Sequence, residues 1–118
     1  KQNPDNKDNI DFIQKLNTFI LENMSDEHFS IDNIASQFAI SRTNLNNKIK
    51  NISGITPNDY IKLIRLNKSA ELLGSGKYRI NEVCFLVGFN SPSYFSKCFF
   101  EHFGKLSKDY MQMGTASI

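Results

Sequence analysis

The sequence lacks several features that mark common classes of protein. It has no tryptophan, two cysteines and two histidines, and no CxxC pair. No apolar run approaches the ~20 residues of a membrane-spanning helix, and the polar N-terminus does not fit a signal peptide. An initiating Met is also missing, which is consistent with a piece of a longer chain. The 118 residues are 40% hydrophobic, enough for one compact unit or two small ones with a real core.

Catalytic and metal-binding patterns are missing too. The chain has no Gly-rich phosphate loop and no cluster of Ser, His and acid with a plausible geometry. Cys98 and His102 are four residues apart and could share a metal on one helix, but no second pair of ligands accompanies them. Cys84 and Cys98 instead suit buried apolar positions of a protein from a reducing cytosol. We therefore expect no enzyme activity, no cofactor and no metal.

Charge is divided unevenly along the chain. Residues 1–32 carry three Lys against seven Asp and Glu, whereas residues 33–118 carry eleven Lys and Arg against five acids. An excess of this size can be solvated surface, so by itself it favours an anionic partner only modestly.

The sequence is rich in helical periodicity. After a polar tether, Phe12, Leu16 and Phe19 recur at the spacing of an amphipathic helix. Thr56 followed by Pro57 is a strong helix start, and no stretch alternates with period two for long enough to make a strand. These patterns predict an all-α fold of about seven helices. Their expected ranges are 10–24, 30–38, 41–54, 56–73, 80–87, 91–103 and 107–113.

One unit is present twice. "IDNIASQFAIS" and "INEVCFLVGFN" superpose with an offset of 49, which places Ala39 on Gly88. The helices that follow superpose with an offset of 50, which places Leu45 on Phe95. Each copy is a helix, a tight turn with a small residue and a second helix, the layout of a helix-turn-helix. The predicted division is a tether (1–9), a first helix-turn-helix subdomain (10–55), a linker helix (56–76) and a second subdomain (77–118).

Residues 89–104, "FNSPSYFSKCFFEHFG", hold five Phe and one Tyr. Such rings could form a core, a stacking surface for bases or a membrane-seeking stripe. Helical spacing favours the core. The predicted core and rim residues are Phe89, Phe95, Phe99 and Phe103, with Cys98 and His102 on the same stripe. The opposite face is predicted to hold Ser93, Ser96, Lys97 and Phe100, of which Phe100 alone is apolar.

That polar face suits a reader of DNA. The second helix of a helix-turn-helix lies in the major groove, where Asn pairs with adenine, Lys reaches the guanine acceptors and Ser or Thr suits several bases. A merely solvated face usually mixes Glu with Lys, but the outward positions of both units contain no acid. Base contacts are predicted from Thr43, Asn46, Asn47, Ser93, Ser96 and Lys97. Phosphate contacts are predicted from Ser41, Arg42, Lys48, Lys50, Ser91 and Tyr94. Two such helices on a linker helix ~25 Å long can reach major grooves ~34 Å apart.

These motifs resemble a known family. "INEVCFLVGFNSPSYFSKCFFEHFG" resembles the GF-x-x-x-x-YF-x-x-x-F-x-x-x-FG signature of AraC/XylS-type bacterial transcription regulators, and "IASQFAISRTNLNNKIKNISGITPNDYIKLIRLNKSAELL" is similar to their first unit and linker helix. The resemblance covers about residues 30–113 and implies recognition helices at 41–52 and 91–103. The family usually has a basic residue where this chain has Asn47 and Phe100.

The resemblance also implies a function and partners. It implies sequence-specific binding of a double-stranded DNA operator and regulation of transcription, with RNA polymerase as a second partner. The helix at 10–24 with "DEHFSI" is similar to the segment before the output domain of hybrid two-component sensor-regulators in gut Bacteroidetes. This implies fusion to an upstream sensing or receiver/dimerisation module. It also implies a cytoplasmic domain, free or at the cytoplasmic end of a membrane-bound sensor-regulator, with no small-molecule site in this fragment.

A different class of function fits the same residues. A helical protein–protein interaction module could use Phe100 and its neighbours as an exposed aromatic anchor. The response to salt separates the two hypotheses, because DNA binding weakens steeply between ~50 and ~200 mM salt and a hydrophobic contact hardly responds.

Overall fold

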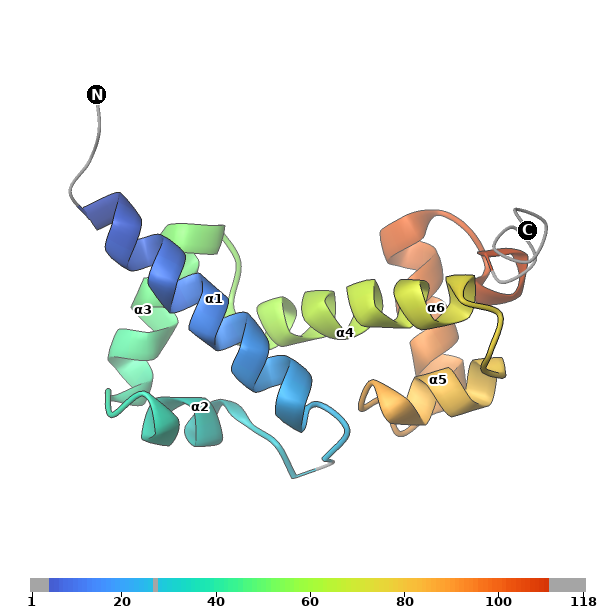
Figure 1. The fold of residues 1–118 in the computed structure, drawn as a ribbon, viewed down its shortest axis with the longest axis horizontal. Helices are drawn as coiled ribbons and strands as arrows, with labels where there is room; N and C mark the ends of the chain where they lie inside the picture. The colour runs from blue at the N-terminus through green and yellow to red at the C-terminus, as the bar shows by residue number, and fades with distance from the viewer. Residues whose placement is uncertain (1–4, 27, 111–118) are drawn as a thin grey trace. The chain divides into compact units, whose positions relative to one another are not determined.

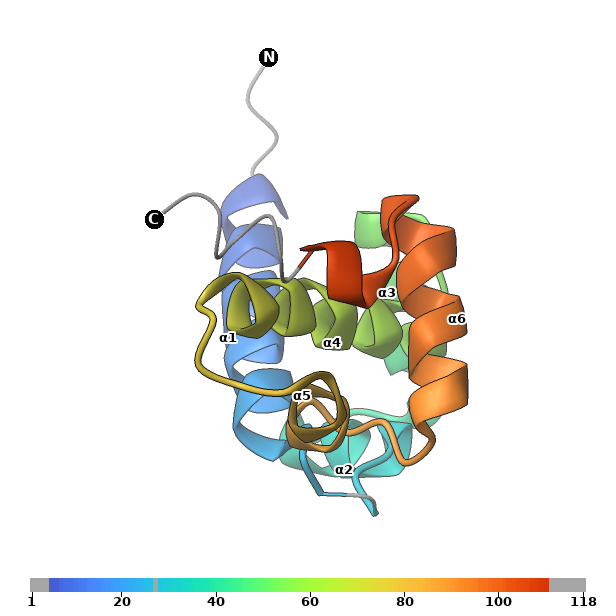
Figure 2. The same cartoon turned by 90° about the vertical axis from the view of Figure 1, so that its right-hand side faces the viewer.

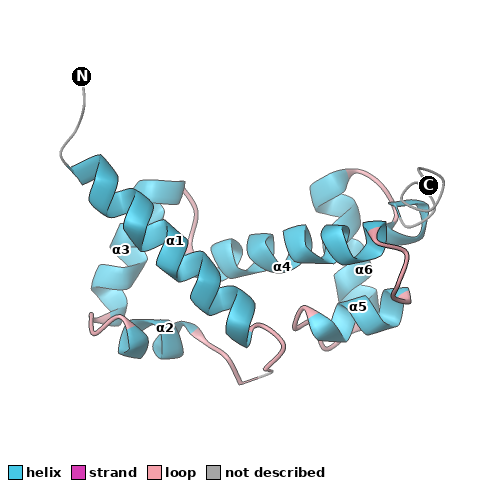
Figure 3. Ribbon diagram, viewed as in Figure 1, coloured by secondary structure: helices cyan, strands magenta, loops and turns pink. Residues whose placement is uncertain are grey.

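The computed structural model describes residues 5–26 and 28–110, and within these ranges the protein is all-α, as predicted (Figures 1 and 3). A further helical segment starts at Ser107 and is described as far as Tyr110. Its predicted end at residue 113 lies outside the described residues. The helices are α1 (Asp5–Asn23), α2 (Ile31–Gln37), α3 (Arg42–Ser53), α4 (Pro57–Gly74), α5 (Ile80–Leu86) and α6 (Pro92–Phe103).

The first helix begins earlier than its sequence pattern predicts. Residues 5–9, expected to belong to a flexible tether, form the first turns of α1. They contain no apolar residue, so they carry no periodic signal that a sequence could reveal. Residues 1–4 of the expected tether lie outside the described residues.

The described chain divides into two compact units. Of the described residues, the first unit contains 5–23 and 28–64, and the second contains 24–26 and 65–110. The division falls within α4 and leaves Met24, just after α1, with the second unit.

The first unit has a core drawn from α1, α2 and α3, with Tyr60 and Ile61 of α4 also buried. Leu16, Ile20, Ile34 and Leu45 are fully buried at 0% exposure. The ring of Phe12 meets that of Phe38 edge to face at 5.3 Å between centroids. α1 contributes one apolar stripe to this core, as the amphipathic pattern predicted, and its exposed side carries Ile10 (50% exposed) and Leu21 (44% exposed) among polar residues.

A buried tyrosine links α4 to α1 within this unit. Tyr60 is 7% exposed, and its hydroxyl donates a hydrogen bond to the Asn17 side chain. Burial raises the pKa of Tyr60 above its usual value of 10.0, although the hydrogen bond to Asn17 acts in the opposite direction. The folded protein therefore favours the neutral phenol.

This burial predicts a loss of stability in alkali. A raised folded pKa contributes stability that is fully present below pH ~10 and is lost as the pH rises through the folded pKa. In Tyr60→Phe this contribution should disappear, and the lost hydrogen bond should cost about 1 kcal/mol at neutral pH. Urea unfolding at several pH values would measure both effects, with Tyr78→Phe as the control. The same alkaline loss in Tyr60→Phe as in the wild type would contradict the assignment.

The second unit has an aromatic core. Phe95 and Phe99 are fully buried and Phe89 is 6% exposed, so the prediction that these rings build the core is confirmed. Phe103, predicted for the core rim, is half-buried. His102 was predicted on the same stripe but is exposed, and its ring lies edge to face with that of Phe103 at 4.6 Å between centroids. In Figure 2, α5 is seen nearly end-on with α6 beside it.

Both cysteines of this unit are buried free thiols. The Cys84 thiol lies 3.5 Å from the Phe89 carbonyl oxygen, and burial raises the pKa of this thiol. A thiol held in its neutral form is a poor nucleophile. Cys84 therefore acts as a small apolar core residue.

The two helix-turn-helix turns have the same backbone hydrogen bonds. Ile40 N–H donates to the Ala35 carbonyl at 3.1 Å, and Phe89 N–H donates to the Cys84 carbonyl at 3.0 Å. The residue before each donor has a positive φ, +54° at Ala39 and +99° at Gly88. Both turns are therefore left-handed helix ends, a conformation that glycine adopts without strain and that Ala39 adopts with its Cβ.

Candidate DNA interface

Local signals place α3 with one polar side outward. The Ser41 hydroxyl caps its start by accepting a hydrogen bond from Asn44 N–H at 3.0 Å, and Gly54 ends it with φ +82°. Leu45 and Ile49 are 0% and 1% exposed and fix which side of the helix faces the core. The opposite side is therefore the one available to a ligand.

α6 has the same kind of start, end and buried side as α3. Its start is capped by the Ser91 hydroxyl, which accepts from Tyr94 N–H at 3.3 Å, and Gly104 ends it with φ +71°. Phe95, Cys98 and Phe99 turn inward. Each unit thus presents the outward face of its second helix, as the repeat predicts.

All six residues predicted to contact bases are exposed. In each unit they project from the outward side of the second helix, within its first two turns. Those of α3 are Thr43, Asn46 and Asn47, and those of α6 are Ser93, Ser96 and Lys97. The exposure each role requires is present, but the contacts themselves remain predictions.

The residues predicted to contact phosphate have more varied surroundings. Arg42 forms an exposed ion pair with Asp32 at 3.3 Å, which is worth little in water and so can be exchanged for a phosphate at small cost. The Lys48 ammonium lies over the ring of Phe12 at 4.9 Å from its centroid, which gives this residue a structural role that the sequence did not reveal. Lys50 is exposed.

The other three phosphate candidates are hydroxyl residues. Ser41 and Ser91 use their oxygens as helix caps, which leaves each hydroxyl hydrogen available to donate to an anion. Tyr94 is 50% exposed, and its ring lies 6.0 Å from that of Phe89. These positions at the helix starts suit phosphate contacts, because helix N-termini favour anions.

A hollow beside α3 adds residues that the sequence analysis missed. A cavity of about 450 Å³ is lined by Arg42, Thr43 and Asn46 of α3 together with Thr56 and Asn58 at the start of α4. The polar run "TPND" was interpreted only as a helix cap. Its position beside the predicted reading residues makes Thr56 and Asn58 additional candidates for DNA contact.

One acidic residue is exposed on α6, the helix that carries three of the predicted base contacts. Glu101 is exposed on α6, one turn after Lys97. The predicted base contacts themselves include no acid. Any repulsion of phosphate by Glu101 therefore acts one turn after Lys97, the last of the predicted base contacts on α6.

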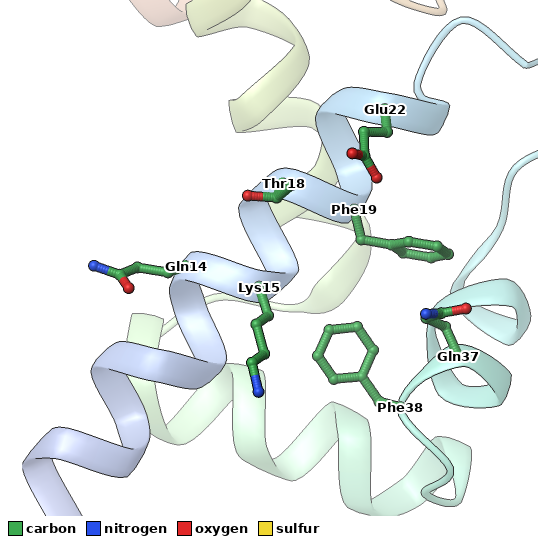
Figure 4. A pocket seen from close by; sticks show the side chains of 7 residues that line it. All are labelled: Gln14, Lys15, Thr18, Phe19, Glu22, Gln37 and Phe38. Atoms are coloured by element: carbon green, nitrogen blue, oxygen red, sulfur yellow. The ribbon is translucent and has the colours of Figure 1, made fainter.

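A second hollow of the first unit lies between α1 and α2 and has a volume of about 550 Å³ (Figure 4). The rings of Phe19 and Phe38, 6.2 Å apart, form its apolar part. Lys15 and Glu22 on its rim have opposite charges. The hollow therefore lacks the single sign of charge that attracts a nucleic acid.

Two helix-turn-helix units, each with an exposed polar face on its second helix, define a DNA-binding protein of the helix-turn-helix class. Residues 34–113 match the model of a family described as "Helix-turn-helix domain". The chain belongs to this family, as an AraC-type DNA-binding domain of transcription regulators. The family is a DNA-binding one and not an enzyme family.

Three similar proteins illustrate this relationship. Histidine kinase P4 of Formosa agariphila is 39% identical over 98 residues, which cover 83% of this chain and 7% of that protein. The HTH-type transcriptional activator RhaS of Salmonella arizonae is 30% identical over 100 residues, covering 83% of this chain and 36% of that protein. The C-terminal domain of AraT, a response regulator from Geobacillus stearothermophilus, superposes with a TM-score of 0.75 at 27% identity and covers 86% of this chain and 84% of that one.

The chain spans only part of the length of the curated relatives that it matches. The chain spans a small part of the kinase and about a third of the activator, so it corresponds to one domain of each. Among the helices described here, none combines the length and apolar character needed to cross a bilayer.

Proposed function

We propose that the domain reads two half-sites of a DNA operator, with α3 and α6 as recognition helices in successive major grooves. The observation that carries this proposal is the repeat itself. Both second helices are capped by a serine, ended by a left-handed glycine and exposed along a polar side. A helix presented in this way matches the docking geometry of helix-turn-helix proteins, whose half-sites recur every ~34 Å.

The side chains assign different bases to the two half-sites. Asn46 and Asn47 are suited to adenine through paired amide hydrogen bonds, and Lys97 is suited to the O6 and N7 acceptors of guanine. The hydroxyl groups of Thr43, Ser93 and Ser96 can form hydrogen bonds with several different bases. The phosphate contacts proposed for Arg42, Lys50 and the helix starts would set the register without reading sequence.

We further propose that the domain is the output end of a longer two-component regulator. Its similarity to a histidine kinase and to the C-terminal domain of a response regulator supports this arrangement. An upstream sensing or receiver module would then dimerise two copies of the domain and raise affinity through effective concentration. RNA polymerase is the proposed second partner, because a transcription activator is among the relatives.

Selection from a randomised duplex library at ~50 mM salt tests the reading of two half-sites. Two enriched blocks about one helical turn apart are expected. One block would show that a single unit reads bases, and no enrichment by the folded domain would contradict the proposal. Affinity for the selected duplex should also fall steeply from ~50 to ~200 mM salt.

Two variants then test the assigned contacts. Asn46→Ala should relax base preference in one half-site and Lys97→Ala in the other, each by about 1–3 kcal/mol of discrimination. Asn67→Ala and Lys77→Ala remove the same groups at exposed positions outside α3 and α6 and should leave preference unchanged. An equal loss of affinity on every sequence would show that Asn46 or Lys97 contacts the backbone rather than a base.

A further inference from the structure

One apolar residue stands on the outward face of α6. Phe100 is 52% exposed, although Phe95 and Phe99 of the same helix are fully buried. The exposed residues around it on α6 include Ser96, Lys97 and the adjacent Glu101, with Ser93 two turns earlier. Residues 93, 97 and 100 are spaced i, i+4 and i+7, so they form one stripe along the helix. The benzene ring of Phe100 is therefore presented together with the proposed base contacts.

The internal repeat supports this placement. With the offset of 50, Leu45 corresponds to Phe95 and Ile49 to Phe99, and all four are at most 1% exposed. The buried side chains thus fix the same helical register in both units. In that register Phe100 corresponds to Lys50, which is also exposed. The first unit has a cation at this position and the second unit has an aromatic ring.

We infer that Phe100 reads a thymine in the second half-site through the thymine 5-methyl group. The inference rests on the proposed function, because it requires α6 to lie in the major groove. A phenyl ring has no hydrogen-bonding group and no charge, so it gains nothing from phosphates or from base acceptors. The methyl group of thymine is the apolar group on the base edges of the major groove. Phe is one of the side chains that make an apolar contact with this methyl group. Stacking is excluded in an intact duplex, where the base faces are covered.

The geometry also locates the thymine. Phe100 lies three residues after Lys97, a rise of about 4.5 Å along the helix axis. Base pairs are stacked ~3.4 Å apart. The thymine is therefore within one or two base pairs of the guanine assigned to Lys97. Phe85, also 52% exposed, belongs to α5 and is not part of this stripe.

Substituting deoxyuridine for thymine tests the inference, because it removes the methyl group alone. Each thymine of the second half-site in the selected duplex is replaced in turn. The wild-type domain should lose affinity by about three- to fourfold at one position, the effect of one methyl group removed from an apolar contact. Phe100→Ala should bind the thymine and deoxyuridine duplexes equally. Phe85→Ala, with the same exposed fraction, should retain the wild-type difference.

A second variant uses the residue of the first unit. Phe100→Lys should bind all duplexes more tightly at low salt, because it adds a cation, yet it should not distinguish thymine from deoxyuridine. Loss of the distinction in both Phe100 variants would support methyl recognition.

The remaining outcomes overturn the inference in recognisable ways. If the wild type binds its selected duplex but no deoxyuridine substitution weakens binding, Phe100 does not read a methyl group, while DNA reading stands. The same holds if Phe100→Ala retains the wild-type sensitivity, as it would if the ring instead served a protein partner. If no duplex is bound specifically, the proposed function fails as well.

Discussion

Gly88→Ala is expected to destabilise the second unit by about 3 kcal/mol or more, the range of severe steric substitutions. A Cβ atom at this position would lie 1.9 Å from the carbonyl oxygen of Met24 and 2.8 Å from Nε of Arg65. The first of these atoms belongs to the backbone, so it cannot move aside as the end of a flexible side chain would. The left-handed φ of +99° adds a second cost.

Gly104→Ala is the matched control in the same unit. Gly104 also has a positive φ, +71°, but a Cβ there would meet nothing within 4 Å. The loss of stability in Gly104→Ala should therefore be limited to the conformational cost of about 1 kcal/mol. Urea unfolding followed by circular dichroism would compare the two variants. If both variants lost the same free energy of unfolding, the Met24 carbonyl would be able to move away from the new Cβ at little cost. The loss would then come from the turn conformation alone.

The second large effect is expected at Phe95. Its side chain is 0% exposed, and its ring lies 5.2 Å from that of Phe89 and 5.8 Å from that of Phe99. Phe95→Ala would remove the middle ring of this row and leave a cavity, at a cost of about 3–5 kcal/mol. A small domain has only about 5–15 kcal/mol in total, so this one change removes a large part of the stability, and specific DNA binding should be lost at the lower temperature at which the variant unfolds.

Phe100→Ala provides the contrast on the same helix. Because Phe100 is half exposed, its replacement should change the free energy of unfolding by no more than about 0.5 kcal/mol. Thermal unfolding of both variants would measure the difference. If Phe100→Ala were as destabilising as Phe95→Ala, its ring would be part of the core and could not be free to read DNA.

Much of the candidate site was predictable because its signals are local. The caps Ser41 and Ser91 lie within three residues of the amides they bind. The spacing of buried residues then determines which side chains point outward, so the exposure of Asn46 and Lys97 followed from the sequence pattern. The surroundings of the basic residues were not predictable in this way. Lys48 over Phe12 joins residues that are distant in sequence, and no periodic pattern encodes such a pair.

The setting of Arg65 shows the same limit. Its guanidinium lies 3.5 Å from the Met24 carbonyl oxygen, 41 residues away in sequence. Among the described residues, its Nε is buried without a hydrogen-bond partner, and burial lowers the pKa of Arg65. In the sequence, this arginine is one residue of the predicted linker helix (56–76), and no local pattern there indicates the contact.

The sequence by itself determined the all-α class, the repeated helix-turn-helix and the outward faces of α3 and α6. These follow from interactions within about four residues, since caps, left-handed turns and helical periodicity all act over that distance. Only the tertiary structure decided that Met24 belongs with the second unit and that its carbonyl excludes any side chain at Gly88. Ala39, at the equivalent position of the first unit, has a Cβ and a similar turn. The need for glycine in the second turn therefore comes from a backbone approach across more than sixty residues of chain, which the local pattern does not contain.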